Sequence, residues 1–386
     1  MYNFDIENNR RNTDSYRWHI KENEVSLDVA DMDFRVSNEI IKGFEERINQ
    51  GIFGYTYYID EWFEAYIKWN KIKHNLEIDK DWLSFSTGVV PSISSTIRAL
   101  TNVGDKVCVM QPVYNIFFNS VINNKRILVS SDLIYENGRY RINFEDLRNK
   151  LDDPTCKLLI LCNPHNPVGR VWSREELELV GKIAKETNTI VLSDEIHCDL
   201  TNPGISYTPF IGVNEINRDN AIMCVSPTKT FNLAGIQTSA IIIPNENIRK
   251  LVLRQLNTDE CAEGNVLAMI APKLAYLESN IWYEEMINYI YENKLFVTDY
   301  INKNINELSV VESEGLYLMW IDISKISRNC MVFCQKLTVE TGLKVIEGTH
   351  YGPSGEGFIR VNVATNRSRL SYALDKLKDF VKNYKE

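Results

Sequence analysis

Short runs of consecutive apolar residues recur along this chain of 386 residues, and segments with a helical spacing of apolar side chains lie between them. A strand with both faces covered carries such continuous runs, whereas a strand with one wet face alternates apolar and polar residues. The runs therefore predict a sheet with helices packed on both sides. These runs are residues 106–110, 126–130, 157–162, 189–193, 221–225 and 238–243, and a further short strand at 83–86 is expected before the turn at Gly88.

Start signals mark the helices between these strands. Ser37 is expected to cap one helix, because its hydroxyl can accept a hydrogen bond from a free N–H group of the first turn. Asp60 begins a second helix, and a third follows Gly88. Ser173 and Glu176 have the spacing of a capping box, which predicts another helix start.

The alternation of strands and helices predicts two domains in a chain of this length. Residues 46–280 are expected to form a large α/β three-layer domain. Residues 1–45 plus 281–386 are expected to form a smaller α+β domain, entered through a long helical stretch that breaks near Ser279. Its expected elements are strands at 316–321, 343–346 and 357–363 and helices near 328–341 and 367–384.

Composition limits the partners and the compartment. Lysine and arginine number 43 and aspartate and glutamate 52, so the net charge of −9 argues against binding to nucleic acid or to an anionic membrane surface. No apolar run reaches the roughly 18 residues of a transmembrane helix, and the first residues lack a signal-peptide pattern. The eight cysteines are interpreted as reduced thiols, several of them within apolar runs. We therefore expect a cytoplasmic protein.

Polar side chains that follow several strands are expected at one edge of the sheet, because catalytic and binding groups gather where the strands of an α/β sheet end. Lys229, Asp194 and Asn163 each follow such a run. Thr87-Gly88-Val89-Val90 joins a strand to a helix and exposes N–H groups that bind anions. The lysine by itself has two possible roles, as a phosphate ligand or as the amine of a Schiff base with an aldehyde cofactor.

An amine, a carboxylate, an amide and an anion site at one edge match the needs of pyridoxal 5′-phosphate. The amine bonds to its aldehyde, and the carboxylate keeps its ring nitrogen protonated so that the ring accepts electrons. The amide donates a hydrogen bond to the ring oxygen, and the N–H groups bind the phosphate. No metal is expected, because the acidic pair Asp31 and Asp33 lacks a third ligand at a fitting distance and is interpreted as fixing its loop.

Five motifs occur in a characteristic order along the chain. They are Thr87-Gly-Val-Val, Asn163-Pro-His-Asn-Pro-Val-Gly, Asp194-Glu, Ser226-Pro-Thr-Lys229, and Arg360 within Phe358-Ile-Arg-Val-Asn362. In this set the sequence resembles the fold-type I pyridoxal-phosphate enzymes, the aspartate-aminotransferase superfamily, over nearly its whole length. The resemblance implies an aspartate-aminotransferase-like α/β fold with a large three-layer domain and a smaller α+β domain.

Further segments resemble one branch of that superfamily, the MalY/PatB-type cystathionine β-lyases, which are C–S lyases. These segments are Val29-Ala-Asp-Met-Asp-Phe34, Gly51-Ile-Phe-Gly-Tyr55, Ser193-Asp-Glu-Ile-His-Cys-Asp199 and Thr228 to Thr238. Two departures from the aminotransferase pattern agree with this branch. His197 stands where a tyrosine is usual, and the arginine usual on the phosphate side after the lysine is absent, with Gln237 in that region.

The resemblance implies roles for individual residues. Lys229 is expected to be catalytic and to bind the cofactor. The other expected cofactor-binding residues are Gly88, Val89, Val90, Tyr114, Asn163, Asp194, His197, Ser226 and Tyr55, the last reaching the phosphate of a neighbouring subunit in a homodimer with shared active sites. The expected substrate-binding residues are Arg360, Asn163 and Ala30, with the planar guanidinium of Arg360 on the substrate carboxylate.

The implied reaction is cleavage of L-cystathionine or related S-substituted cysteines to a thiol, pyruvate and ammonia. Transamination of an amino acid is the alternative, because nearly the same residues serve both outcomes, and a lyase with an added regulatory partner role is a third reading. Two of the side chains have two possible roles each. Tyr114 stacks on the cofactor or packs in the core, and His197 contacts the ring oxygen or packs beneath its strand. His165 is expected at the surface of its loop.

Overall fold

The seven expected strands pair into one sheet in the computed structural model, which describes residues 2–385. In spatial order the sheet consists of β2 (Leu83–Ser86), β10 (Ser239–Ile242), β9 (Ala221–Val225), β8 (Ile190–Asp194), β7 (Cys156–Cys162), β3 (Lys106–Val109) and β4 (Ile127–Ser130). β10 runs antiparallel to both of its neighbours, and the other pairs are parallel. β2 and the parallel strands therefore all end at the same edge.

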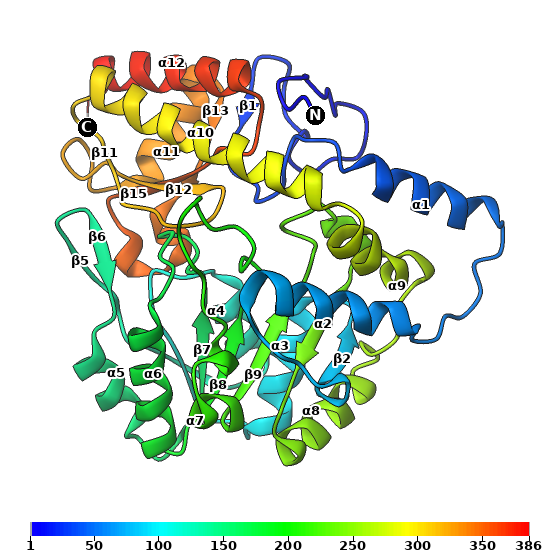
Figure 1. Cartoon of the computed structure of the whole chain (residues 1–386). Coiled ribbons are helices and arrows are strands. Elements are labelled where there is room, and N and C mark those ends of the chain that lie inside the picture. The colour runs from blue at the N-terminus through cyan, green and yellow to red at the C-terminus, as the bar shows by residue number, and fades with distance from the viewer. Residues whose placement is uncertain (1, 386) are drawn as a thin grey trace.

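Helices cover both faces of this sheet (Figure 1). Alternate strand residues point to opposite faces, so Leu158 and Ile160 pack beneath one layer while Leu159 and Leu161 pack beneath the other. One layer contains α3 (Val89–Leu100), α4 (Ile116–Asn123) and α8 (Glu246–Thr258), and the other contains α2 (Asp60–His74), α5 (Phe144–Leu151), α6 (Arg174–Glu186) and α7 (Glu215–Asp219). The expected α/β three-layer fold is confirmed.

The C-terminal part forms a second, smaller layer structure above the large sheet (Figure 1). Among the described residues its antiparallel sheet has the order β11 (Ser309–Val310), β12 (Leu318–Asp322), β15 (Phe358–Asn362) and β14 (Ile346–Glu347). Its helices are α10 (Asn280–Asn304), α11 (Cys330–Thr341) and α12 (Arg367–Asn383). β1 (Val25–Ser26) pairs with β13 (Leu343–Lys344), so the N-terminal segment lies against this part.

The expected domain boundary at residue 46 falls inside a helix, α1 (Asn38–Asn49). α1 packs on α9 (Val266–Pro272) and on a short π-helical turn, η4 (Lys273–Leu277). Pro272 lacks the N–H that a regular α-helix needs, and α10 begins at Asn280 after this interruption. The break near Ser279 is therefore confirmed, whereas the division into two domains stays a prediction.

Local sequence signals explain most of the remaining elements. The hydroxyl of Ser37 accepts a hydrogen bond from Ile40 N at 3.2 Å, and Ser173 with Glu176 forms the capping box at the start of α6. The hairpin of β5 (Ile134–Glu136) and β6 (Arg139–Arg141) was missed by the sequence reading. Its Asn137-Gly138 turn, with φ of 51° and 80°, is the two-residue signal that favours such hairpins. Short 3₁₀ turns complete the chain at Lys80–Trp82, Phe210–Gly212, Ala234–Ile236, Gly348–Tyr351 and Pro353–Gly355.

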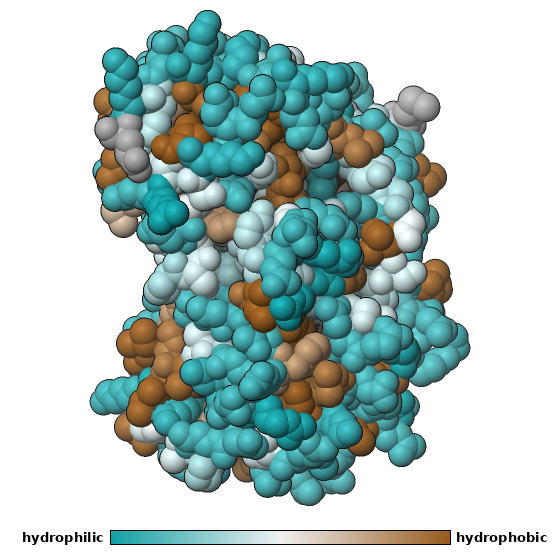
Figure 2. Space-filling view, turned by 90° about the vertical axis from the view of Figure 1, so that its left-hand side faces the viewer, coloured by the Kyte–Doolittle hydropathy of each residue, from teal (hydrophilic) through white to brown (hydrophobic). Residues whose placement is uncertain are grey.

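Over the described residues the surface is largely polar, and the connection from α1 to α2 exposes several large apolar side chains close together. Figure 2 shows a face on which hydrophobic residues lie in small scattered groups among hydrophilic ones. By contrast, the connection from α1 to α2 exposes Ile52, Phe53, Tyr55 and Tyr57 by 62% or more of their surface. Within residues 2–385, no helix is long and apolar enough to cross a membrane.

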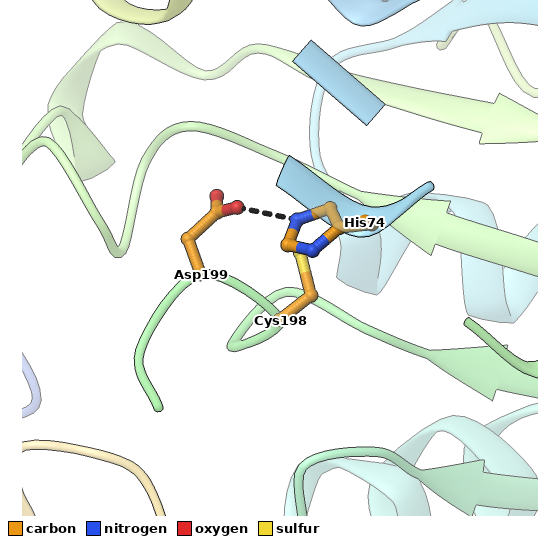
Figure 3. A group of neighbouring side chains, drawn as sticks. All are labelled: His74, Cys198 and Asp199. Atoms are coloured by element: carbon orange, nitrogen blue, oxygen red, sulfur yellow. Dashed lines mark hydrogen bonds and ion pairs between the residues drawn. The ribbon is translucent and has the colours of Figure 1, made fainter. Parts of the chain in front are cut away.

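A buried carboxylate joins α2 to the loops beyond the sheet edge (Figure 3). Asp199 accepts hydrogen bonds from Trp69 Nε1 at 2.7 Å and His74 Nε2 at 2.8 Å on one oxygen, and from Thr230 Oγ1 at 3.3 Å on the other. Nitrogen, sulfur and oxygen atoms of His74, Cys198 and Asp199 lie within 4.8 Å of one another, close enough to hold a metal ion. Both carboxylate oxygens, however, already accept hydrogen bonds. Because Thr230 follows Lys229, this cluster ties the lysine loop to α2.

We expect Asp199→Ala to lower the free energy of unfolding of the cofactor-free protein by roughly 3 kcal/mol, because it leaves three buried donors without their acceptor. Urea unfolding followed by tryptophan fluorescence measures this. Asp299→Ala is the matched control, since Asp299 is 59% exposed in an ion pair with Lys303, and a change below about 0.5 kcal/mol is expected there. Equal effects of the two variants would contradict the anchoring role.

Candidate active site

A cavity of about 380 Å³ lies at the edge where β2, β9, β8, β7 and β3 end. Its walls come from the turn after β2, from Asp194 at the end of β8 and from the loop after β9. Of the residues expected from the sequence to form a site, the cavity brings together Gly88, Val89, Val90, Tyr114, Asp194, His197, Lys229 and Ala30.

Lys229 lies on the connection between β9 and β10. Its Nζ donates a hydrogen bond to the carbonyl oxygen of Ala30 at 2.7 Å. Burial, with a further contribution from the nearby Arg360 guanidinium, lowers the pKa of Lys229 to about 8, although Asp31 and Asp194 act in the opposite direction. The neutral amine that a base or a nucleophile requires is therefore far more populated near neutral pH than in an ordinary lysine.

Asp194 is the last residue of β8 and is buried at the floor of the cavity. One carboxylate oxygen accepts a hydrogen bond from Ile196 N at 3.1 Å. Burial raises the pKa of Asp194 to about 7, although the Ile196 N–H and the Lys229 charge both favour its ionised form. A cation placed in the cavity beside this carboxylate would stabilise the ionised form, so the site favours a ligand with a protonated nitrogen here.

The turn after β2 supplies an anion site. Gly88 precedes the first residue of α3, and no side chain caps the free N–H groups of that helix start. Val89 and Val90 line the cavity at this point, and Thr228 and Gln237 line it opposite. Unpaired N–H groups at a helix N-terminus bind anions. The structure thus places an anion site in the same cavity as the amine and the carboxylate.

Tyr114 and His197 also line the cavity. His197 is buried, its pKa is lowered to about 3 by burial with further effects of Lys229 and Arg360, and its Nδ1 has no partner among the described residues. This imidazole is therefore neutral, with one buried nitrogen that lacks a hydrogen-bond partner. Tyr114 packs edge-on against Phe117 with ring centres 5.8 Å apart, which leaves its stacking role as a prediction.

Besides Tyr55, which is expected to act on the neighbouring subunit, two expected cofactor residues do not line this cavity. The Asn163 amide donates to Thr208 O at 3.1 Å, because Asn163 still belongs to the sheet edge, where its N–H bonds to Asp194 O. Ser226 Oγ accepts from Thr228 N at 3.1 Å and donates to Thr238 O at 2.6 Å, so its hydrogen bonds are used within the loop.

Two residues that the sequence reading missed line the cavity in their place. They are Asn166, the second asparagine of its motif, and Thr228, two residues after Ser226. The repeated asparagine and the second hydroxyl were the signals available in the sequence. His165 is also corrected: it is buried, not on the surface, with its ring packed on Trp172 and Nε2 at 2.9 Å from Pro112 O.

Arg360 lies on β15, next to the cavity. Its Nη2 donates to Asp28 O at 2.5 Å and its Nη1 to Asn166 Oδ1 at 3.4 Å, and its Nε has no partner among the described residues. The guanidinium is buried and contacts a carbonyl and an amide. A buried arginine with an unused donor is suited to a carboxylate, which it can bind with two parallel hydrogen bonds.

The N-terminal segment 28–33 closes one side of the site. Its carboxylates are fixed by ion pairs, since Arg17 contacts Asp31 at 3.4 Å and Asp33 at 3.3 Å, and Arg10 contacts both as well. The loop-fixing interpretation of Asp31 and Asp33 agrees with this geometry. Tyr55, in contrast, is fully exposed on the connection between α1 and α2 and does not line the cavity of its own chain.

Comparison with known proteins places this site in a family. The model of aminotransferase class I and II matches residues 22–377. The cystathionine β-lyase PatB of Bacillus subtilis is 36% identical and is covered over 99% of its length by 97% of this chain. The structure of cystalysin from Treponema denticola, which contains pyridoxal 5′-phosphate, superimposes with a TM-score of 0.97 at 32% identity, over all of both chains.

A second solved structure agrees with the first. The pyridoxal-phosphate-bound C–S lyase from Staphylococcus hominis, in complex with L-cycloserine, gives a TM-score of 0.93 at 32% identity and covers 99% of this chain and 98% of its own. The match in sequence motifs, the fold and the arrangement of amine, carboxylate and anion site at one sheet edge all lead to the same assignment. This chain belongs to the aminotransferase class I and II family.

Proposed function

We propose that this protein is a pyridoxal-phosphate-dependent carbon–sulfur β-lyase that cleaves L-cystathionine or related S-substituted cysteines to a thiol, pyruvate and ammonia. The observation that carries the proposal is similarity to C–S lyases over essentially the whole chain, at 36% identity to one and 32% to two others. The lyase branch and the cofactor predicted from the sequence are both supported by these relatives.

The residues of the cavity fit the cofactor. Lys229 supplies the amine for its aldehyde, Asp194 a carboxylate for its ring nitrogen, and the start of α3 free N–H groups for its phosphate. Asn166 and His197 are the polar side chains placed to reach its ring oxygen. When bound, the ring withdraws electrons from the substrate carbon next to the amino group, which makes loss of a proton there easier.

The chain's own residues account for binding and proton transfer. Arg360 holds the substrate α-carboxylate through Nε and one Nη. Lys229, with its lowered pKa, takes the proton from the α-carbon as general base, and the Ala30 carbonyl accepts a hydrogen bond from the resulting ammonium. Loss of the proton leaves the β-carbon able to expel a thiolate without a second substrate. Asp194 stays ionised against the protonated ring nitrogen.

Transamination is the second candidate, because the family is described by its aminotransferases and the same lysine and arginine would serve. The two functions differ in what they need: a transaminase requires a keto acid as acceptor, whereas β-elimination does not.

We further propose a homodimer with shared active sites in the cytoplasm. The support for the homodimer is the exposed apolar segment at residues 52–57, including the fully exposed Tyr55, together with the absence of the arginine usual in the aminotransferase pattern, with Gln237 in that region. A tyrosine from the neighbouring subunit would add a hydrogen-bond donor for the phosphate that the cavity of one chain lacks.

The proposed reaction is tested by product release. We expect the holoenzyme to release pyruvate and thiol from L-cystathionine with no keto acid present, and Lys229→Ala to lose at least about 10²-fold of this rate because it removes the base. Lys273→Ala, which changes a lysine that is 40% exposed, is expected to match the wild type. Turnover that requires a keto acid and forms the matching amino acid would support the aminotransferase instead.

The raised pKa of Asp194 predicts a pH-dependent stability difference in the cofactor-free protein. A carboxyl that keeps its proton to about pH 7 when folded, but only to about pH 4 when unfolded, costs stability progressively as the pH rises between these values. Burial raises the pKa of Glu195 to about 8 and the Asp194 charge contributes to this rise, so loss of that charge in the variant lowers the cost of Glu195 and acts in the same direction. We expect Asp194→Asn to melt above the wild type at pH 8 and close to it at pH 4.

Differential scanning fluorimetry of the two proteins from pH 4 to 8 measures this effect, with Asp299→Asn as the exposed control. Added pyridoxal phosphate should narrow the gap at pH 8, because a cationic ring nitrogen stabilises the Asp194 carboxylate and not the amide. A melting difference that stays constant with pH would contradict the buried-acid interpretation.

The shared site is tested by subunit complementation. Lys229→Ala and Tyr55→Ala each impair every site of their own homodimers. Mixed and reassembled in equal amounts, they should regain about a quarter of wild-type activity, because about half of the dimers are mixed and each mixed dimer has one site with both residues. Activity of the mixture that equals the mean of the two separate variants would show that Tyr55 acts within its own chain or not at all.

A further inference from the structure

Tyr317 reaches the active site without belonging to any motif of the sequence. It precedes β12, it is fully buried, and its hydroxyl donates a hydrogen bond to the carbonyl oxygen of Ala30 at 3.0 Å. The same oxygen accepts the hydrogen bond from Lys229 Nζ at 2.7 Å. The tyrosine and the lysine therefore share one acceptor.

The backbone that presents Tyr317 is in an uncommon conformation. Leu316 has a φ of 66°, in the left-handed region that costs a leucine energy. Surrounding bonds hold it there: Leu316 N donates to Leu200 O at 2.6 Å, and Tyr317 O accepts from Val363 N at 2.9 Å. The buried Nζ of Lys294 also donates to Gly315 O at 2.9 Å. Strain maintained by this many contacts is typical of residues that must be aimed at a functional site.

The hydroxyl of Tyr317 acts as a donor throughout the working pH range. Burial raises the pKa of Tyr317 above its ordinary value, so the phenol keeps its proton. Its ring packs edge-on against His197, with centres 6.3 Å apart, which fixes the direction of the hydroxyl. The bond to Ala30 is thus a constant feature of the site and does not depend on ionisation of the tyrosine.

We propose that Tyr317 is a positioning residue for Lys229, which holds the Ala30 carbonyl in place and shares it with the amine. A carbonyl that accepts fully from an ammonium favours the charged lysine. Sharing the oxygen with a phenol weakens that preference, so that Lys229 is held at a fixed point and yet remains available as a neutral amine. The consequence for turnover rests on the proposed function, whereas the effect on the lysine itself does not.

The other groups that face Lys229 are known from the structure. They are Asp194 at the end of β8, His197 on the following loop, Arg360 on β15 and Asp31 on the N-terminal segment. Tyr317→Phe leaves all of them in place and removes one oxygen atom. A change in the titration of Lys229 in this variant therefore reports on the shared hydrogen bond.

The experiment uses the cofactor-free full-length protein. Acetylation of Lys229 by acetic anhydride is followed by peptide mass spectrometry as a function of pH. We expect Tyr317→Phe to move the midpoint upward by about half a pH unit, the size of a modest change in one hydrogen bond. Tyr283→Phe is the matched control, because it removes another tyrosine-to-carbonyl bond, to Asp199 O at 2.9 Å, and it should leave the midpoint unchanged.

A second variant makes the test independent of folding defects. Difluorotyrosine incorporated at position 317 keeps the shape of the side chain and strengthens its O–H donor, so the midpoint should move downward. Shifts of opposite sign in the two variants support the proposal, and an unchanged midpoint or shifts of the same sign overturn it. In the holoenzyme, Tyr317→Phe should lower kcat about tenfold with KM changed less than about twofold, since Arg360 is untouched.

These results separate the inference from the proposed function. Opposite midpoint shifts in a protein that releases no pyruvate from any S-substituted cysteine would retain the positioning role and reject the lyase. Pyruvate release from a protein whose Lys229 titrates identically in all variants would retain the lyase and reject the positioning role.

Discussion

Burial at one edge of the large sheet determines whether the titratable side chains of the site hold or release their protons. The same burial lowers the pKa of Lys229 to about 8 and raises the pKa of Asp194 to about 7. The charged forms of both groups, the ammonium of Lys229 and the carboxylate of Asp194, are costly to bury, and the pKa shifts reflect this cost. A ligand that brings a cationic nitrogen to Asp194 and bonds to the amine of Lys229 relieves both costs, which explains why the charges of the cavity suit pyridoxal phosphate.

The N-terminal segment 28–33 links the site to the smaller, C-terminal part of the chain. Its backbone carbonyls accept the side-chain donors of the site: Asp28 O accepts from Arg360, Ala30 O from Lys229 and Tyr317, and Asp31 O from Asn362 at 2.7 Å and Arg17 at 2.8 Å. In the proposed function, a substrate carboxylate would replace the Asp28 carbonyl oxygen as a partner of Arg360. The carboxylates of Asp31 and Asp33 hold the segment through their arginine partners, and the Asp31 charge also raises the pKa of Lys229.

The sequence predicted the parts of the structure that depend on local patterns. Continuous apolar runs located six strands of the large sheet, the Gly88 turn marked the seventh at 83–86, and strand-end residues identified Lys229 and Asp194. The errors concern residues whose role depends on the direction in which the side chain points. Asn163 and Asn166 occur in the same motif, and the sequence does not show which of the two side chains faces the cavity. The backbone N–H of Asn163 continues the sheet ladder to Asp194 O, and this turns the Asn163 side chain away from the cavity. Tyr317 could not be found from the sequence either, because its partner Ala30 lies 287 residues away and no local spacing relates the two.

The antiparallel insertion of β10 has a mechanical consequence for the lysine. In a parallel sheet the segment that follows a strand must leave the edge and cross the sheet before it pairs again. Here the chain leaves β9 at Val225 and re-enters the sheet beside it, where Ala240 pairs with Val225. The intervening segment is anchored at both ends by the strands β9 and β10, and Thr230 within it donates a hydrogen bond to Asp199. The backbone that carries Lys229 is therefore attached at both ends to neighbouring strands of one sheet, which limits how far the amine can move relative to the groups at the sheet edge.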